Sequence, residues 1–146
     1  MTTIAYRDGV LACESLVTAG TMRAGSLQDK IARSPQGYIA GAAGRMGHNV
    51  AFNRWIEAGM PEEAKPELGD DFDAIIVSPD GVVSYVSDKL VICPIDAPFA
   101  AIGSGEKYAM AAMEMGASAE RAIEVAMKFD TSSGGEIKTL KLGEPR

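Results

Sequence analysis

The sequence has 146 residues, of which 47% are apolar and 23% are charged. These values are typical of one globular domain spanning residues 1–146, and they exclude a disordered chain, a collagen-like repeat and a coiled coil. The 14 basic and 20 acidic residues give a net charge of −6 without a basic cluster, so we expect neither nucleic acid nor membrane as a partner. No apolar run approaches the ~20 residues of a membrane-spanning helix and no signal-peptide pattern begins the chain, so we expect a cytoplasmic protein.

The first part of the chain is predicted to form mainly strands. Residues Thr2–Tyr6 and Val10–Cys13 are mostly β-branched, aromatic or apolar, and they flank the turn pair Asp8-Gly9. This pattern predicts a hairpin at the start of the chain. A looser stretch rich in Gly, Thr and Ser follows at Thr18–Ser26. The run Tyr38–Ala42 predicts a buried strand whose small residues allow another layer to approach closely.

One helix and a polar loop are expected next. Apolar side chains recur at helical spacing over Met46–Ala58, and Gly59-Met60-Pro61 ends the predicted helix. The acidic and polar stretch Pro61–Asp71 predicts a linker or a surface loop.

The second half is predicted to contain a hairpin, a further strand, a pair of helices and a last strand. Ser118 is the expected N-cap of the second helix of the pair. The order of strands, one helix, strands and a helix pair indicates the α+β class, with helices covering a mostly antiparallel two-sheet core. The predicted elements are Ala74–Val77 and Val82–Val86 around the turn Pro79-Asp80-Gly81, the strand Phe99–Ile102, the helices Glu106–Met115 and Ala119–Phe129, and the strand Glu136–Leu142.

Several residues of reactive type suit ordinary structural roles. Cys13 and Cys93 each lie in an apolar run, which favours small buried side chains in a reducing compartment. His48 begins the predicted helix with no hydroxyl or thiol obviously beside it, which favours a capping or surface role. The methionines on the first helix of the pair are expected to fill the core; they are Met110, Met113 and Met115.

The sequence has no recognisable cofactor motif. The glycine clusters at 41–47 and 103–105 fit neither the dinucleotide-binding pattern nor the P-loop spacing. No group of His, Cys, Asp or Glu has a recognised metal-ligand spacing. We therefore expect no cofactor and no metal.

Thr2 is the residue that points to chemistry. Methionine before a small residue is commonly removed, and removal here would leave Thr2 with a free α-amine at the start of a strand. That amine has a pKa of about 8 and lies next to the hydroxyl, so it can act as the general base of its own nucleophile. Such a site also needs a nearby cation, a carboxylate that orients this cation, and a backbone N–H that receives the oxyanion.

Segments that suit these needs occur in order along the chain. They are Thr2-Thr3-Ile4-Ala5 with Gly9-Val10-Leu11-Ala12, Glu14-Ser15 with Val17-Thr18-Ala19-Gly20, Lys30-Ile31, Ala40-Gly41-Ala42-Ala43-Gly44, Ala101-Ile102-Gly103-Ser104-Gly105 with Tyr108-Ala109, and Asp130-Thr131-Ser132-Ser133-Gly134-Gly135. In this order they resemble the proteasome β-subunit family of N-terminal nucleophile (Ntn) hydrolases, which includes the bacterial two-component form HslV. The resemblance covers most of the chain.

The resemblance implies a threonine-type peptidase with the αββα sandwich of antiparallel sheets, acting as a homo-oligomeric ring on unfolded polypeptides. An ATP-dependent unfoldase is a possible partner in this family. The implied roles are Thr2 as nucleophile and its amine as base, Lys30 as the cation, Glu14 as the partner of Lys30, Gly44 as the oxyanion donor, and Ser104, Asp130 and Ser133 as residues that position the amine and a water.

The sequence departs from the family at two points besides the Met1 that precedes Thr2. Glu14 stands where the family has an aspartate, and its extra methylene is expected to displace Lys30. Only one helix is expected between Gly44 and Ala74, where the family has two, so one helical layer is reduced. Two alternatives therefore stay open: a catalytically silent assembly or interaction module that retains Met1, and a non-proteolytic amidase of the same nucleophile class.

Overall fold

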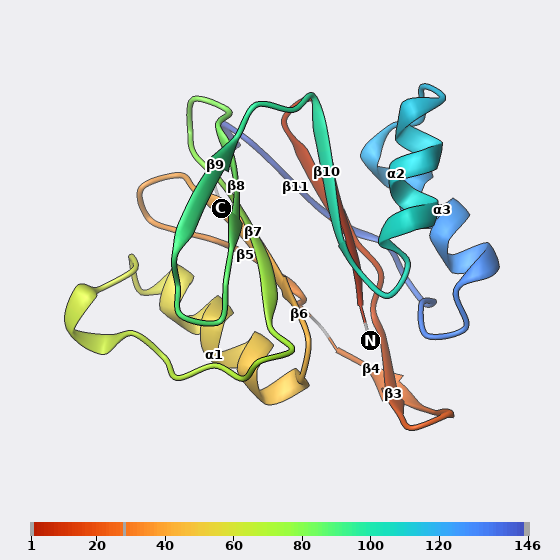
Figure 1. The fold of residues 1–146 in the computed structure, drawn as a ribbon, viewed down its shortest axis with the longest axis horizontal. Helices are drawn as coiled ribbons and strands as arrows, with labels where there is room; N and C mark the ends of the chain where they lie inside the picture. The colour runs from red at the N-terminus through yellow and green to blue at the C-terminus, as the bar shows by residue number, and fades with distance from the viewer. Residues whose placement is uncertain (1, 28, 145–146) are drawn as a thin grey trace.

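Two antiparallel sheets form the centre of the protein (Figure 1). The structure, a computed structural model, describes residues 2–27 and 29–144. The first sheet has the order β10-β1-β2-β11, and β1 and β2 form the predicted hairpin around Asp8-Gly9. Its strands are β1 (Thr3–Arg7), β2 (Val10–Cys13), β10 (Phe99–Gly103) and β11 (Lys138–Lys141).

The second sheet has the order β5-β6-β7-β8-β9, and β7 and β8 form the second predicted hairpin. Strand β9 lies at an edge of this sheet, which corrects the expectation that Cys93 is buried: on β9 its side chain is exposed. The strands are β5 (Ile31–Arg33), β6 (Ile39–Ala43), β7 (Asp73–Val77), β8 (Val83–Val86) and β9 (Ile92–Ile95).

The stretch expected to be loose forms a separate two-stranded hairpin. Strands β3 (Leu16–Ala19) and β4 (Met22–Ser26) pair antiparallel, with Gly20 in the turn at φ +61°. Every residue of β4 is exposed, so this hairpin projects from the two sheets (Figure 1). Its sequence lacks the apolar alternation that identifies a half-buried strand, because neither face of β4 packs on a core.

Helices cover the outer faces of the two sheets. Helix α1 (Met46–Glu57) packs on β5 and β6, and a short 3₁₀ turn, η1 (Glu62–Ala64), lies in the loop that follows. Helices α2 (Glu106–Glu114) and α3 (Ala119–Phe129) pack together on β1, β2 and β10 (Figure 1). The hydroxyl of Ser118 accepts a hydrogen bond from the N–H of Arg121, as expected of the N-cap.

Strand β1 sends its alternate side chains into two different cores. Ile4 belongs to the buried cluster between the two sheets, whereas Ala5 belongs to the cluster under α2 and α3. The sheets approach closely at Gly41, where an added Cβ would lie 2.7 Å from Cδ1 of Ile4. Met113 is fully buried, as expected. Met115 is 87% exposed, so the expectation that it fills the core is wrong.

The predicted mixture of helices with antiparallel sheets is confirmed. The third buried cluster lies between α1 and the second sheet and centres on Phe52, whose ring meets Phe72 edge-on at a centroid distance of 5.2 Å. Helix α1 therefore holds the second sheet by an aromatic contact with the chain segment just before β7.

We predict that Phe52→Ala lowers the free energy of unfolding by about 3–5 kcal/mol, because it leaves a cavity under α1. Met115→Ala, at an exposed position, should change it by less than about 0.5 kcal/mol. Urea unfolding followed by circular dichroism measures both values. A cost at Phe52 no larger than at Met115 would contradict the assignment of this core.

Candidate active site

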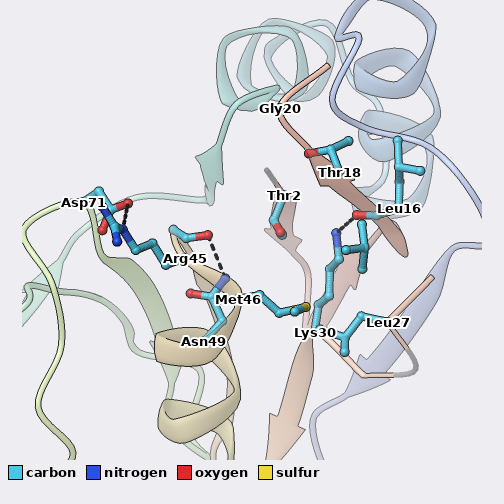
Figure 2. A pocket seen from close by; sticks show the side chains of 12 residues that line it. Thr2, Leu16, Thr18, Gly20, Leu27, Lys30, Arg45, Met46, Asn49 and Asp71 are labelled. Atoms are coloured by element: carbon cyan, nitrogen blue, oxygen red, sulfur yellow. Dashed lines mark hydrogen bonds and ion pairs between the residues drawn. The ribbon is translucent and has the colours of Figure 1, made fainter. Parts of the chain in front are cut away.

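Thr2 lies immediately before the first residue of β1 and lines a pocket of about 360 Å³. Thr2 is only 4% exposed. The alternation of side chains that continues from β1 places Thr2 on the same face as Ile4, toward the second sheet. Figure 2 shows Thr2 between Lys30 and the start of α1, with the Met46 side chain reaching across toward Lys30. The other lining residues are Leu16, Val17, Thr18, Gly20, Leu27, Gly44, Arg45, Asn49 and Asp71.

A buried ion pair stands beside this pocket. The ammonium of Lys30 lies 2.9 Å from Oε1 of Glu14, and it also donates to the carbonyl oxygen of Leu16 at 2.7 Å. Glu14 is fully buried and Lys30 is 4% exposed. The pair therefore places the Lys30 cation next to Thr2. Because Lys30 is buried, its positive charge acts more strongly on neighbouring groups than it would in water.

Backbone donors satisfy the Glu14 carboxylate. Oε1 accepts a hydrogen bond from the N–H of Thr3, and Oε2 accepts one each from the N–H groups of Leu16 and Gly134, all at 3.1 Å. These donors come from three separate chain segments, and each offsets part of the cost of burying a charge. The Glu14 side chain therefore contacts Lys30 and three backbone N–H groups at the same time.

A second polar network lies on the other side of β1. The carboxylate oxygen Oδ2 of Asp130 accepts hydrogen bonds from the hydroxyls of Ser104 at 2.6 Å and Ser133 at 2.5 Å. The N–H of Ser104 donates to the carbonyl oxygen of Thr2 at 2.9 Å, and the Ser133 hydroxyl lies 2.7 Å from the hydroxyl of Thr3. The network therefore fixes the main chain of Thr2.

The hydrogen bonds keep Asp130 ionised. Partial burial alone would raise the pKa of its carboxyl, but the donated hydrogen bonds from Ser104, Ser133 and the N–H of Ser132 outweigh burial and lower that pKa below its ordinary value. Asp130 thus brings a stable negative charge to the Thr2 end of β1.

Gly44 lies where β6 passes into α1, and it lines the same pocket as Thr2. Its φ is +137°, a backbone conformation that residues with side chains rarely adopt. An added Cβ would also lie 2.8 Å from the carbonyl oxygen of Asp71. Only glycine fits here. On its other side Gly44 borders a second pocket of about 510 Å³, which Ser104 also lines.

The structure brings together the seven residues singled out from the sequence in two groups that meet at Thr2. Thr2, Lys30 and Gly44 line one pocket, and Glu14 forms an ion pair with Lys30. Ser104, Asp130 and Ser133 form the network that contacts the carbonyl of Thr2 and the side chain of Thr3.

Sequence reasoning missed two polar residues of this region. The fully buried Thr3 hydroxyl accepts a hydrogen bond from the N–H of Gly105 and contacts Ser133. Asn49, on α1, is 5% exposed and its side chain contacts Gly44. A polar residue at a position that the helical or strand pattern assigns to the interior is the signal that could have found both.

Two other residues considered from the sequence lie outside this pocket. His48 is half-buried and its Nδ1 accepts a hydrogen bond from the N–H of Gly69 at 3.2 Å. Burial raises the pKa of the Cys13 thiol to about 12, helped by the charge of Glu14, so the thiol stays protonated near neutral pH. Neither residue lines the pocket that contains Thr2.

Within residues 2–27 and 29–144, no group of three or more metal-binding side chains is close enough to hold a metal ion. In the same residues, no helix combines the length and the apolar character needed to cross a membrane.

The fold is similar to that of solved proteasome-like proteins. Thiobacillus denitrificans BPH in complex with epoxomicin matches with a TM-score of 0.71 and 18% sequence identity, over 98% of this chain and 99% of that chain. A second structure of Thiobacillus denitrificans BPH matches with a TM-score of 0.67 and 18% identity, over 99% of both chains. No protein-family model and no curated protein sequence matches the chain. The chain therefore has a proteasome-like fold, which its structure reveals.

We predict that Glu14→Gln lowers the free energy of unfolding by about 3–5 kcal/mol, because it leaves the Lys30 cation buried without its counter-charge. The exposed pair Glu62–Lys65 is the matched control, and Glu62→Gln should cost less than about 1 kcal/mol. Lys30→Met in the Glu14→Gln background should recover part of the loss. Additive costs in the double variant would contradict the coupling.

A second prediction concerns acid. The pKa of Asp130 is lower in the folded than in the unfolded chain, so its ionised form stabilises the fold above the unfolded pKa of about 4, and this contribution is lost as the pH falls through the folded pKa. We expect the stability difference between wild type and Asp130→Asn to be largest near pH 7 and to shrink below about pH 4. Urea unfolding at pH 7, 5, 4 and 3 measures this difference, and a constant value would refute it.

Proposed function

We propose that this protein is a threonine peptidase of the proteasome and HslV kind, in which Thr2 becomes the N-terminal nucleophile once Met1 is removed. Met1 lies outside the described residues, so its removal is part of the proposal. The observation that carries it is the position of Thr2: it lines a pocket with Gly44 and with a lysine that Glu14 holds.

In the proposed reaction, the α-amine of Thr2 takes the proton of the Thr2 hydroxyl while the oxygen attacks the carbonyl carbon of a peptide bond. Lys30 favours the neutral amine and the more acidic hydroxyl, because its positive charge disfavours a second positive charge and stabilises a negative one. The N–H of Gly44 donates to the oxyanion of the tetrahedral intermediate.

Collapse of the intermediate breaks the C–N bond and the ammonium of Thr2 returns a proton to the leaving amine. This leaves an ester between the substrate acyl group and the Thr2 oxygen. Water, deprotonated by the same amine, then attacks the ester. The bond between the acyl carbon and the Thr2 oxygen breaks, the ammonium returns its proton to that oxygen, and the acid product is released. We propose that Ser104, Asp130 and Ser133 position the amine and this water. The hydrogen bond from the Ser104 N–H to the Thr2 carbonyl supports that role, and Asp130 joins the hydroxyls of Ser104 and Ser133.

The proposal extends to architecture and partners. We propose that the two sheets and their helices are the αββα sandwich of the Ntn hydrolases, with α1 as the reduced helical layer. We further propose that the protein acts in a homo-oligomeric ring on unfolded polypeptides, with an ATP-dependent unfoldase as a possible partner. The exposed β3–β4 hairpin beside the pocket is a surface on which a neighbouring subunit could pack.

The test is intact-mass spectrometry before and after treatment with epoxomicin. We expect the mature wild type to lack Met1 and to gain one inhibitor on Thr2, because only a free N-terminal threonine combines hydroxyl and amine. Thr2→Ala should gain none and should lose peptide cleavage. Thr139→Ala, on β11 away from the pocket, is the control that should react like wild type.

Retention of Met1 without an adduct would sink the proposal and favour the silent assembly module. An adduct on Thr2 together with cleavage of small amides, but not of unfolded polypeptides, would favour the amidase.

A further inference from the structure

Gly44 is a flexible residue at a position that the proposed reaction needs to be rigid. Glycine adopts positive and negative φ about equally, so an unrestrained Gly44 would turn its N–H in several directions. On its N-terminal side, Ala43 is held in register with Asp73 of β7. The N–H belongs to the peptide between Ala43 and Gly44, so its direction relative to α1 depends on the φ and ψ angles of Gly44, and a contact that holds the Gly44 carbonyl limits these angles.

Asn49 holds that side. Its Nδ2 donates to the carbonyl oxygen of Gly44 at 3.2 Å, from one turn into α1 (Figure 2). Because a carbonyl only accepts, the nitrogen of the amide must face it, and this fixes the orientation of the Asn49 side chain. The peptide planes on both sides of Gly44 are thus restrained.

The contact is not an ordinary helix cap. Arg45 is the N-cap residue of α1, and its side chain makes no capping hydrogen bond. Asn49 is 5% exposed, and among the described residues its Oδ1 has no hydrogen-bond partner. A buried carbonyl oxygen without a donor is destabilising, and an apolar side chain of similar size would avoid this cost. The amide nitrogen is the part of Asn49 that has a partner.

We propose that Asn49 is a positioning residue that orients the N–H of Gly44 toward the oxyanion. This inference rests on the proposed function. Without the Nδ2 contact, Gly44 samples other conformations and the donor is misplaced in part of the molecules. Asn49 also lines the pocket, so a direct contact with substrate would change KM, whereas a misplaced Gly44 N–H lowers kcat.

Asn53 provides a matched control. It lies one turn further along α1, is 6% exposed, and has an Oδ1 that also lacks a partner within residues 2–27 and 29–144. It does not line the Thr2 pocket. A role in packing alone predicts the same behaviour for both asparagines.

The experiment compares Asn49→Leu with Asn53→Leu, and Asn49→Ala with Asn53→Ala, by peptide cleavage and thermal unfolding. Leucine removes the orphan oxygen and fills the space, so we expect both leucine variants to fold. At Asn49 we expect kcat to fall roughly ten- to a hundredfold with KM within about twofold of wild type, as for a misplaced catalytic group. At Asn53 we expect kcat within about twofold of wild type. Equal changes in kcat at the two positions would overturn the proposal.

A second measurement separates this proposal from the proposed function. The backbone order parameter of the Gly44 amide, from 15N relaxation, should fall in Asn49→Leu and stay unchanged in Asn53→Leu, because the Nδ2 contact restrains this residue. If wild type gains no epoxomicin on Thr2, the proposed function fails while the order parameter of Gly44 still reports whether Asn49 restrains this peptide. An unchanged order parameter in Asn49→Leu overturns the positioning role whatever the activity.

Discussion

The structure depends most on one buried carboxylate. Glu14 contacts the start of β1 through the N–H of Thr3, the start of β3 through Leu16, the Lys30 ammonium and the loop at Gly134. A buried charge is tolerated only when such partners surround it, so each of these segments must occupy its place before Glu14 is satisfied. The position of the cation beside Thr2 is therefore fixed by the same interaction that joins four distant parts of the chain.

The alternation of side chains along β1 places Thr2 and Thr3 in different environments. The two-residue period of a strand sends Thr2 and Ile4 toward the second sheet, and Thr3 and Ala5 toward α2 and α3. Thr2 thereby meets the pocket while Thr3, one residue on, is hydrogen-bonded into the network around Ser133. Adjacent threonines of the same chemistry thus have different environments, and a shift of one residue in register would exchange them.

The sequence predicted those elements whose signals are local. The hairpin around Asp8-Gly9 and helix α3 with its Ser118 cap follow from turn and capping residues. Strands β4 and β9 were missed because their residues are exposed and carry no apolar alternation. The site depended on family resemblance, because contacts such as Lys30 with Glu14 or Ser104 with Asp130 join residues that no spacing rule connects.

Helix α1, between β6 and β7, contributes residues both to the core and to the Thr2 pocket. Its C-terminal half packs Phe52 and Ile56 on the second sheet, whereas its N-terminal half places Met46 in the Thr2 pocket and Asn49 against Gly44. A rotation of the helix that improved the packing of Phe52 would move Asn49 by a comparable amount, since both lie on one rigid element. The Oδ1 of Asn49 has no partner among residues 2–27 and 29–144, a local cost that packing on the same helix offsets. Stability and site geometry therefore cannot be adjusted independently in α1.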